Sequence, residues 1–461
     1  MKKLLIPVVA LLMASCAEKP QEAVIVGQVT NASKDFVLLT KGGIVDTIKL
    51  DADSRFAVNV PLAKPALMSL QAHRKSGFFY VAPGDSIKAV ITDPADRGVI
   101  TFEGSKHKIN AYLPEVNRII SGVYGNAKSI FTAEKEQFLA KMDSVKKAAL
   151  GLMDSMQINN PEVRALESKR IDYAILDYTS QYPQMNKYFK GEEYVFNAQD
   201  FDFMTTFNPN AGEDLMFQPY VSVVRSFISN KMNESVSPEE YSALKDEERI
   251  AKVFALIDAN ITDKSVNDYI KYLELDETLK YGDFVAATNA VNEYVATCQN
   301  ETLKSIVKST YDKRMLLAPG VKGFAFELTD IDGKTVKLED LAGGLVYIDF
   351  WATWCGPCRR ELPSLIQLEK DYHGKKVHFV SISLDHDKAA WEKFVPANNL
   401  KGVQLHADGD WQSAVATNYQ IAGVPTFFLL DGNGVIIAPN APRPSDPSIR
   451  TLLDENLAKM E

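Results

Sequence analysis

Leu345-Val-Tyr-Ile-Asp-Phe-Trp-Ala-Thr-Trp-Cys-Gly-Pro-Cys-Arg-Arg-Glu-Leu-Pro363 joins an apolar run to a closely spaced pair of cysteines. The run is rich in β-branched and aromatic residues, which is typical of a strand buried on both faces of a sheet. Residues 359 to about 373 have the pattern of a helix, and Gly374 is placed to end it. Cys355 and Cys358 are therefore expected where a strand passes into a helix, and a Cys-x-x-Cys pair at such a junction indicates a dithiol redox site.

The two cysteines have different expected roles. Cys355 is expected at the helix N-terminus, where unpaired backbone N–H groups and the positive end of the helix dipole favour thiolate over thiol, so it is the predicted nucleophile. Cys358 is expected in the first helical turn, shielded by the chain, and is the predicted resolving thiol. Gly356 has no side chain and Pro357 has no N–H, so neither adds a side-chain donor that would stabilise the thiolate further. This favours a reductant over a strong oxidant.

Asp349 is the single acidic residue inside the apolar run. A carboxyl group in a central strand has no route to water, and burial raises the pKa of such a group. We expect Asp349 to take and return the proton of Cys358, as a general acid and base. The alternative is a buried, hydrogen-bonded aspartate without a catalytic role.

Downstream, Ile421-Ala-Gly-Val-Pro-Thr426 leads into a second apolar run over residues 427–430. Proline is tolerated at the first residue of a strand. Taken alone, Pro425 could be an ordinary trans proline that enters an edge strand.

Together, Asp-Phe-Trp-Ala-x-Trp-Cys-Gly-Pro-Cys and the later Gly-Val-Pro-Thr resemble the motifs of the thioredoxin superfamily. Three further features are similar to its membrane-anchored, extracytoplasmic branch, the TlpA-like and ResA-like thiol:disulfide reductases. These are Phe324-Ala-Phe-Glu-Leu-Thr-Asp-Ile-Asp-Gly-Lys-Thr335, Glu361-Leu-Pro363 and an extra segment at about 384–410. The resemblance covers roughly residues 319–461 and implies an α/β thioredoxin-like fold there.

The resemblance also implies roles for individual residues. Pro425 would be cis and lie beside Cys355, with the backbone of Val424 pairing to the substrate chain. Glu361 matches an acid that tunes the cysteines in that branch, although a solvated charge on an amphipathic helix is an equal alternative. From the Gly356-Pro357 dipeptide itself, which adds no side-chain donor, we expect a reduction potential nearer the ~−270 mV of thioredoxin than the ~−120 mV of a strong oxidant. The predicted substrate-binding residues are Trp351, Trp354, Gly356, Pro357, Val424, Pro425 and Thr426.

The N-terminus predicts export. Met1-Lys-Lys and the following Leu4-Leu-Ile-Pro-Val-Val-Ala-Leu-Leu-Met13 are the charged and apolar parts of a signal peptide, expected at residues 1–15. Leu12-Met-Ala-Ser-Cys16 resembles a bacterial lipoprotein cleavage box, so we expect a lipidated Cys16 and a polar tether over residues 16–22. The alternative is a plain secretory signal with an incidental cysteine. The expected location is the bacterial cell envelope, lipid-anchored and facing the periplasm.

Residues 23–104 contain short β-like runs separated by turn clusters such as Pro83-Gly-Asp85, and predict a small antiparallel β-sandwich or barrel. This region resembles an uncharacterised β domain that often precedes TlpA-like domains. Residues 105–317 change to helical spacing and predict an all-α region. Leu317-Ala-Pro-Gly-Val-Lys-Gly323 breaks that pattern, so the thioredoxin-like domain is expected at residues 318–461.

The composition of the chain limits the classes of partner and cofactor that it can be expected to bind. A net charge of −9, or −11 without Lys2 and Lys3, argues against nucleic acid. The histidines are too scattered to predict a metal site, and no nicotinamide or flavin site is evident, so the expected redox group is the Cys355–Cys358 disulfide, without a cofactor. Cys298 is the thiol left over; it is either a reactive spare thiol or, as we expect, a buried apolar-like cysteine.

These observations favour a lipid-anchored thiol:disulfide oxidoreductase that reduces extracytoplasmic proteins, cytochrome precursors among the candidates, and is recharged by a membrane thiol carrier. An oxidase or isomerase on the same fold is one alternative. The other is a binding lipoprotein whose β and helical regions do the main work, with an auxiliary redox domain.

Overall fold

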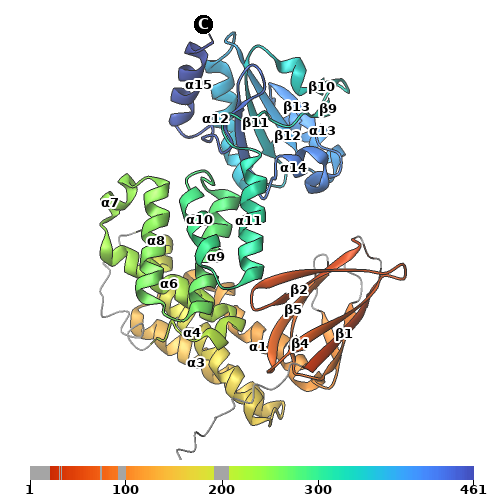
Figure 1. Cartoon of the computed structure of the whole chain (residues 1–461), viewed down its shortest axis with the longest axis vertical. Coiled ribbons are helices and arrows are strands. Elements are labelled where there is room, and N and C mark those ends of the chain that lie inside the picture. The colour runs from red at the N-terminus through yellow and green to blue at the C-terminus, as the bar shows by residue number, and fades with distance from the viewer. Residues whose placement is uncertain are drawn as a thin grey trace, which may run out of the picture. The chain divides into compact units, whose positions relative to one another are not determined.

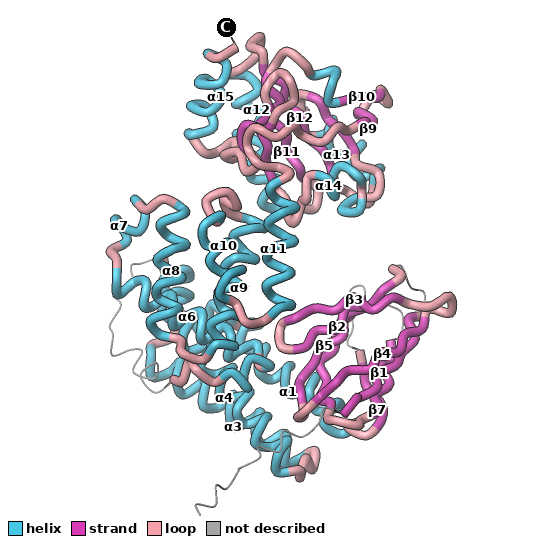
Figure 2. Tube along the Cα trace, in the orientation of Figure 1, coloured by secondary structure: helices cyan, strands magenta, loops and turns pink. Residues whose placement is uncertain are grey.

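The computed structural model describes residues 21–460 except 31, 33, 73–74, 92–99 and 192–206. The predicted signal peptide and the predicted lipidation site at Cys16 therefore lie outside the described residues. The chain forms two compact units, one of Met1–Lys231 with Asn260–Val266 and one of Met232–Ala259 with Asn267–Glu461. Figures 1 and 2 show the sequence of fold types, with strands first, helices next and a mixed α/β region last.

The first unit begins with a sandwich of two four-stranded sheets, in the orders β4-β1-β7-β8 and β3-β2-β5-β6. Alternate side chains of both sheets, such as Ile25, Leu39 and Phe79, meet in one apolar core. This confirms the predicted β-sandwich, with one difference: β1 and β7 pair in parallel rather than antiparallel. The strands are β1 (Gln21–Val29), β2 (Phe36–Lys41), β3 (Ile44–Lys49), β4 (Arg55–Leu62), β5 (Ala66–Ala72), β6 (Lys75–Val81), β7 (Ser86–Ile91) and β8 (Thr101–Gly104).

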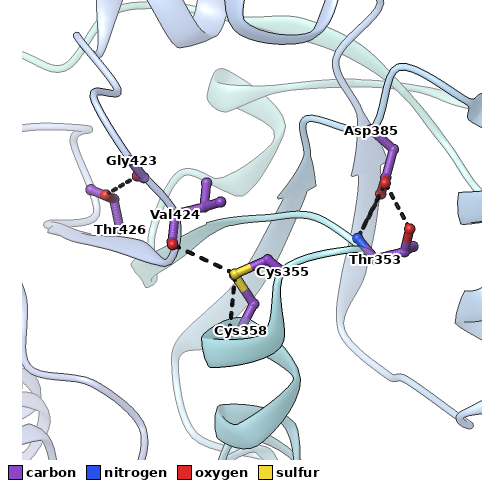
Figure 3. Close-up of a disulfide and its surroundings, with 7 residues drawn as sticks. All are labelled: Thr353, Cys355, Cys358, Asp385, Gly423, Val424 and Thr426. Atoms are coloured by element: carbon purple, nitrogen blue, oxygen red, sulfur yellow. Dashed lines mark hydrogen bonds between the residues drawn. A yellow bond between two sulfur atoms is a disulfide. The ribbon is translucent and has the colours of Figure 1, made fainter. Parts of the chain in front are cut away.

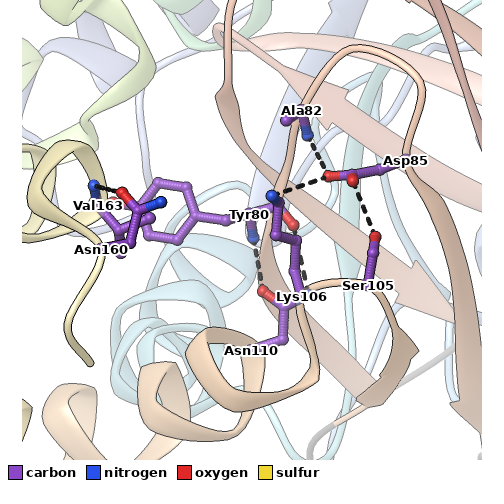
Figure 4. Close-up of polar contacts among 8 residues, drawn as sticks. All are labelled: Tyr80, Ala82, Asp85, Ser105, Lys106, Asn110, Asn160 and Val163. Carbon is purple, nitrogen blue, oxygen red and sulfur yellow. Dashed lines mark hydrogen bonds and ion pairs between the residues drawn. The ribbon is translucent and has the colours of Figure 1, made fainter. Parts of the chain in front are cut away.

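Helix α1 (His107–Gly125) is fixed to this sandwich by buried polar contacts (Figure 4). Asn110 accepts a hydrogen bond from the backbone N–H of Tyr80 at 2.8 Å and donates to its carbonyl at 3.3 Å. The Tyr80 hydroxyl donates to Glu167, which also forms a buried ion pair with Arg170 at 2.7 Å. These contacts cross the predicted boundary at 104/105, because α1 packs directly on β6 and β8.

Helices follow from α1 to α11, and their presence confirms the predicted α-helical region. Two of them, α4 (Pro161–Lys190) and α7 (Pro238–Ala243), begin at typical caps: the Asn160 side chain accepts from the Val163 N–H, and Ser237 with Glu240 forms a capping box. The domain limits 23–104, 105–317 and 318–461 stay predictions. The helices after α1 are α2 (Ala127–Phe131), α3 (Lys135–Ser155), α4 (Pro161–Lys190), η2 (Gly212–Met216), α6 (Gln218–Ser235), α7 (Pro238–Ala243), α8 (Asp246–Asn260), α9 (Lys264–Tyr281), α10 (Thr288–Thr297) and α11 (Glu301–Met315).

The chain ends in a seven-stranded sheet of order β10-β9-β13-β12-β11-β14-β15. β11, β12 and β13 run parallel, while β9 and β14 run antiparallel to their neighbours. Its elements are β9 (Glu327–Asp330), β10 (Thr335–Lys337), η3 (Leu338–Leu341), β11 (Leu345–Trp351), α12 (Gly356–Asp371), β12 (Val377–Ser383), α13 (Lys388–Ala397), β13 (Val403–His406), η4 (Asp410–Gln412), α14 (Ala414–Asn418), β14 (Thr426–Leu430), β15 (Ile436–Ala438) and α15 (Ser448–Ala458).

Strand β11 lies in the middle of this sheet and is buried along its whole length. Leu345 and Tyr347 pack against α12 and α15, and Trp351 packs against α13. On the opposite face, Phe350 packs against Tyr419, which follows α14. The sheet thus has parallel strands at its centre and helices packed on both of its faces, which confirms the predicted thioredoxin-like α/β fold. Among the described residues, no helix combines the length and apolar character needed to cross a bilayer.

Candidate active site

The candidate active site lies where β11 passes into α12. Cys355 occupies the N-cap position of α12, with Pro357 in the first turn, and its sulfur is bonded to that of Cys358. The structure therefore shows the oxidised form of the pair. The helix begins at Gly356, which places Cys355 at its N-terminus and Cys358 in its first turn, as predicted. The helical sequence pattern becomes evident only from residue 359, because the first turn contains a glycine and a proline, of which proline is well suited to that turn.

The environment of the Cys355 sulfur favours negative charge. The backbone N–H of Cys358 donates to Cys355 Sγ at 3.1 Å. The first turn of α12 contains no acidic residue, and Arg359 and Arg360 follow on its exposed surface. Both the N–H donor and the positive end of the helix dipole stabilise a thiolate at this position once the disulfide is reduced.

Asp349 faces the same side of the sheet as the disulfide. Alternate residues of a strand share a face, so Asp349 points the same way as Tyr347 and Trp351. Tyr347 packs against α12, and Trp351 belongs to the cluster that contains Cys355 and Cys358. Burial raises the pKa of Asp349 to about 8, with smaller contributions from the charges of Glu361 and Glu369. Its Oδ1 is buried and has no hydrogen-bond partner among the described residues.

Glu361 is held rather than freely solvated. Its carboxylate accepts hydrogen bonds from the Ser445 backbone N–H at 3.0 Å and from the Ser445 hydroxyl at 2.9 Å. Those contacts tie α12 to the segment before α15, so the carboxylate is not a freely solvated charge, and the tuning role stays a prediction. Glu361 affects the site through its negative charge, which helps to raise the pKa of Asp349.

The loop before β14 borders the disulfide. The Val424–Pro425 peptide bond is cis, and the Val424 carbonyl oxygen lies 3.5 Å from Cys355 Sγ. The Thr426 hydroxyl donates to the Gly423 carbonyl at 2.7 Å, which closes this turn on itself. Figure 3 shows the disulfide between this loop on one side and Thr353 with Asp385 on the other.

The predicted substrate-binding residues differ in accessibility. Gly356 and Pro357 are exposed, and Trp354 is 60% exposed. Trp351 is completely buried, with its ring 5.6 Å from that of Phe394. The prediction that Trp351 contacts the substrate is therefore wrong, because its side chain points into the core between sheet and helix.

The sequence interpretation missed Asp385, which lies two residues after the end of β12. Asp385 is buried and accepts hydrogen bonds from the Thr353 backbone N–H at 2.9 Å, the Thr353 hydroxyl at 2.7 Å and the Ser383 hydroxyl at 2.8 Å. Asp385 thereby fixes the turn that carries Trp354 and Cys355. An acid two residues after the strand paired to β11 was the available signal, since ligands gather at the carboxyl ends of parallel strands.

Replacing Asp385 by alanine should lower the free energy of unfolding by about 3 kcal/mol, because it leaves the partly buried donors of Thr353 and the buried hydroxyl of Ser383 without this partner. Urea unfolding followed by circular dichroism measures this. The control is Asp387→Ala, which removes only the N-cap of α13 and should cost about 1 kcal/mol. Equal losses in the two variants would contradict the assignment.

Cys298 is a buried free thiol directly after α10, and burial raises its pKa. Within the described ranges, no three His, Cys, Asp or Glu side chains are grouped so that they could hold a metal ion.

The family model described as Redoxin matches residues 318–453. The thiol-disulfide oxidoreductase ResA of Bacillus anthracis is 33% identical over 112 residues, which are 24% of this chain and 63% of the relative. The ResA of Bacillus cereus (strain ATCC 10987 / NRS 248) is 30% identical over 134 residues, which are 29% of this chain and 75% of the relative. The chain thus spans less than two thirds of the length of the first of these relatives.

A solved structure of a thiol-disulfide oxidoreductase from Bacteroides fragilis NCTC 9343 is 28% identical and covers 29% of this chain and 98% of that one, with a TM-score of 0.27. The Redoxin match spans β11, α12 and the two cysteines, and the likeness to the Bacillus cereus ResA extends over three quarters of that relative. Through this region, the chain belongs to the ResA-like and TlpA-like branch of the thioredoxin superfamily.

Proposed function

We propose that the protein is a thiol:disulfide oxidoreductase that reduces disulfides of extracytoplasmic proteins through Cys355-Gly-Pro-Cys358. The observation that supports it most directly is the position of the disulfide. Cys355 lies at the N-terminus of α12, receives the Cys358 N–H and lies 3.5 Å from the carbonyl oxygen before a cis proline. A sulfur in this setting is stabilised as a thiolate beside a strip of backbone that can pair with another chain.

The proposed reaction has two exchanges. In the reduced protein, the Cys355 thiolate attacks one sulfur of the substrate disulfide; the substrate S–S bond breaks, a Cys355–substrate disulfide forms and the other substrate sulfur leaves as a thiolate. Cys358 then loses its proton to Asp349 and attacks Cys355 Sγ. The second substrate sulfur leaves, and the Cys355–Cys358 disulfide remains, so two electrons pass from the protein to the substrate.

Asp349 suits the second exchange. Its pKa of about 8 is close to that of a thiol, so the carboxylate form can accept the Cys358 proton without a large energetic penalty. Glu361 acts on this step through its charge on Asp349, as a positioning residue bound to Ser445. Trp354, Gly356, Pro357, Val424, Pro425 and Thr426 form the surface that receives the substrate.

The proposal also covers the source of the reducing electrons and the cellular location of the protein. The disulfide is the redox group and needs no bound cofactor, and a membrane thiol carrier reduces it after each turnover. A lipid on Cys16 holds the protein at the periplasmic face of the bacterial envelope, where proteins with disulfides are found.

The potential of the cysteine pair tests the direction of electron flow. We expect a value nearer about −270 mV than about −120 mV, because neither Gly356 nor Pro357 provides a side-chain donor to the Cys355 thiolate. Equilibration in glutathione and dithiothreitol buffers, followed by thiol alkylation in a Cys298→Ser background, measures it. Pro357→His adds a donor and should raise the potential. A wild-type potential near about −120 mV would favour the oxidase alternative and contradict the proposal.

A further inference from the structure

Access to the nucleophile is narrow. Cys355 is only 4% exposed, although it must form a bond with a sulfur of the substrate. The residue before it in the chain, Trp354, and the carbonyl of Val424, 3.5 Å from its sulfur, border the opening. A substrate disulfide therefore reaches Cys355 on a segment of chain that contacts the surroundings of both residues.

On the side of Trp354, a second tryptophan extends this border. Trp411 lies in η4, is 37% exposed, and its ring centroid is 6.4 Å from that of Trp354. The turn that carries Trp411 is held by Asp410, whose carboxylate lies 3.1 Å from His386 Nδ1 and whose carbonyl accepts from the Ser413 hydroxyl. Asp385 holds the turn that carries Trp354 in the same way. Both indole rings are therefore exposed, and both are carried by backbone that hydrogen bonds fix in place.

On the side of Val424, the helical region provides a third aromatic residue. Tyr281 ends α9 and is 64% exposed. A carbon of its ring lies 3.6 Å from the point where a Cβ on Gly423 would be, and Gly423 directly precedes Val424. Tyr281 is thus in ordinary van der Waals distance of the cis-proline loop, 142 positions away in the numbering of the chain.

Side-chain amides fix this contact. Asn440 Nδ2 donates to the Gly282 carbonyl at 2.6 Å, and Gln420 Nε2 donates to the Lys313 carbonyl at 2.6 Å. The first bond holds the residue after Tyr281, and the second holds the end of α11 to the segment that leads to Gly423. Within the second compact unit, the turn after α9 is therefore part of the surface around Val424.

We propose that Tyr281 and Trp411 extend the substrate-docking surface, which receives an extended, cystine-bearing polypeptide segment with bulky apolar side chains on both sides of the reactive cysteine. The proposal rests on the proposed function, since the segment must reach Cys355. Backbone pairing at Val424 selects an extended chain, and burial of the exposed aromatic rings selects apolar side chains. A small disulfide reaches the sulfur without spanning the distance from Trp411 to Tyr281.

Three disulfides test this surface with the full-length exported chain. Two are synthetic peptides, each closed by one cystine and identical except that either Leu and Phe or Ser and Gly flank the reactive cysteine. The third is 5,5′-dithiobis(2-nitrobenzoate). Reduced protein is mixed with each disulfide, the reaction is quenched with acid, and the released thiols are measured to give second-order rate constants.

We expect the wild type to reduce the apolar peptide about tenfold faster than the polar one, and Tyr281→Ala and Trp411→Ala each to slow the apolar peptide about fivefold. The rates with the small disulfide should stay within about twofold, and Tyr281→Phe should retain the wild-type rate. Tyr241→Ala, which removes an exposed aromatic ring from α7, is the matched control and should change nothing.

The proposal is overturned if the wild type shows no preference between the peptides, or if both alanine variants keep it in full. It is also overturned if the small disulfide slows in step with the apolar peptide, since that outcome indicates general damage to the cis-proline loop. A wild type that reduces none of the three disulfides overturns the proposed function itself, which separates the two failures.

Discussion

Replacing Cys355 by serine should lower the rate of disulfide reduction on the order of 10³-fold or more, because a hydroxyl does not attack a disulfide sulfur and Cys358 is 2% exposed. Cys358→Ser should behave differently. Its Cys355 still attacks, but nothing resolves the product, so the protein accumulates as a covalent adduct with its substrate. Non-reducing electrophoresis and mass spectrometry of the Cys358→Ser protein, exported in its own host, would identify the captured partners.

Cys298→Ser is the matched control, because it removes a buried free cysteine that follows α10 and is not part of the disulfide. It should reduce disulfides at the wild-type rate. If Cys355→Ser retained more than about a tenth of the activity, another residue would be the nucleophile, and the roles assigned to the pair would be reversed or wrong.

Asp349→Asn should slow the resolution of the mixed disulfide about 10²-fold, since the amide cannot accept the Cys358 proton. The first exchange, attack by Cys355, should be much less affected. Rapid mixing with a chromogenic disulfide separates the two steps, because the first releases the chromophore and the second releases the remaining thiol. In the wild type the second step should speed up as the pH rises toward 8, where Asp349 ionises.

The same substitution should change how stability depends on pH. Burial raises the pKa of Asp349 from 3.8 to about 8, so between these values the unfolded chain is ionised at this position and the native protein is neutral. The favourable contribution of the neutral group is fully present below about pH 4 and is lost as the pH rises toward about 8, to a total on the order of 6 kcal/mol. Asp349→Asn cannot undergo this loss.

Urea unfolding of both proteins from pH 4 to pH 9 gives the comparison, and the difference between them isolates residue 349. Asp177→Asn is the control, because burial raises the pKa of Asp177 only to about 6 and the residue lies on α4, outside the sheet that contains Asp349. It should show a smaller pH-dependent gain in stability and a normal resolution step. Parallel stability curves for wild type and Asp349→Asn would show that the carboxyl group is not held neutral.

The strand, the helix start and the buried acid that form the site could be predicted from the sequence, because short-range patterns along the chain determine them. The continuous apolar run of β11 marks a central strand, a proline after Cys355 marks the start of α12, and a single acid in the run marks a buried carboxyl group. Each of these signals lies within about fifteen residues of the disulfide, where spacing along the chain and distance in space agree.

The predictions were wrong or incomplete where spacing along the chain does not indicate position in space. Trp351 was misplaced because a strand buried on both faces gives no alternation to show which way a side chain points. Asp385 and Tyr281 were missed because they reach the site through tertiary packing, from 30 and 74 positions away from Cys355 in the numbering. The parallel pairing of β1 with β7 was missed for the same reason, since it joins strands separated by most of the sandwich.

The bonds from Asn440 to Gly282 and from Gln420 to Lys313 have a practical consequence for anyone who expresses the C-terminal domain alone. A fragment cut at residue 318 keeps both cysteines and the proline loop, yet loses the carbonyl groups that those two amides hold and the phenol ring beside Gly423. Such a fragment should still be a competent reductant of simple reagents. It would be a poor guide to which client proteins the intact molecule chooses.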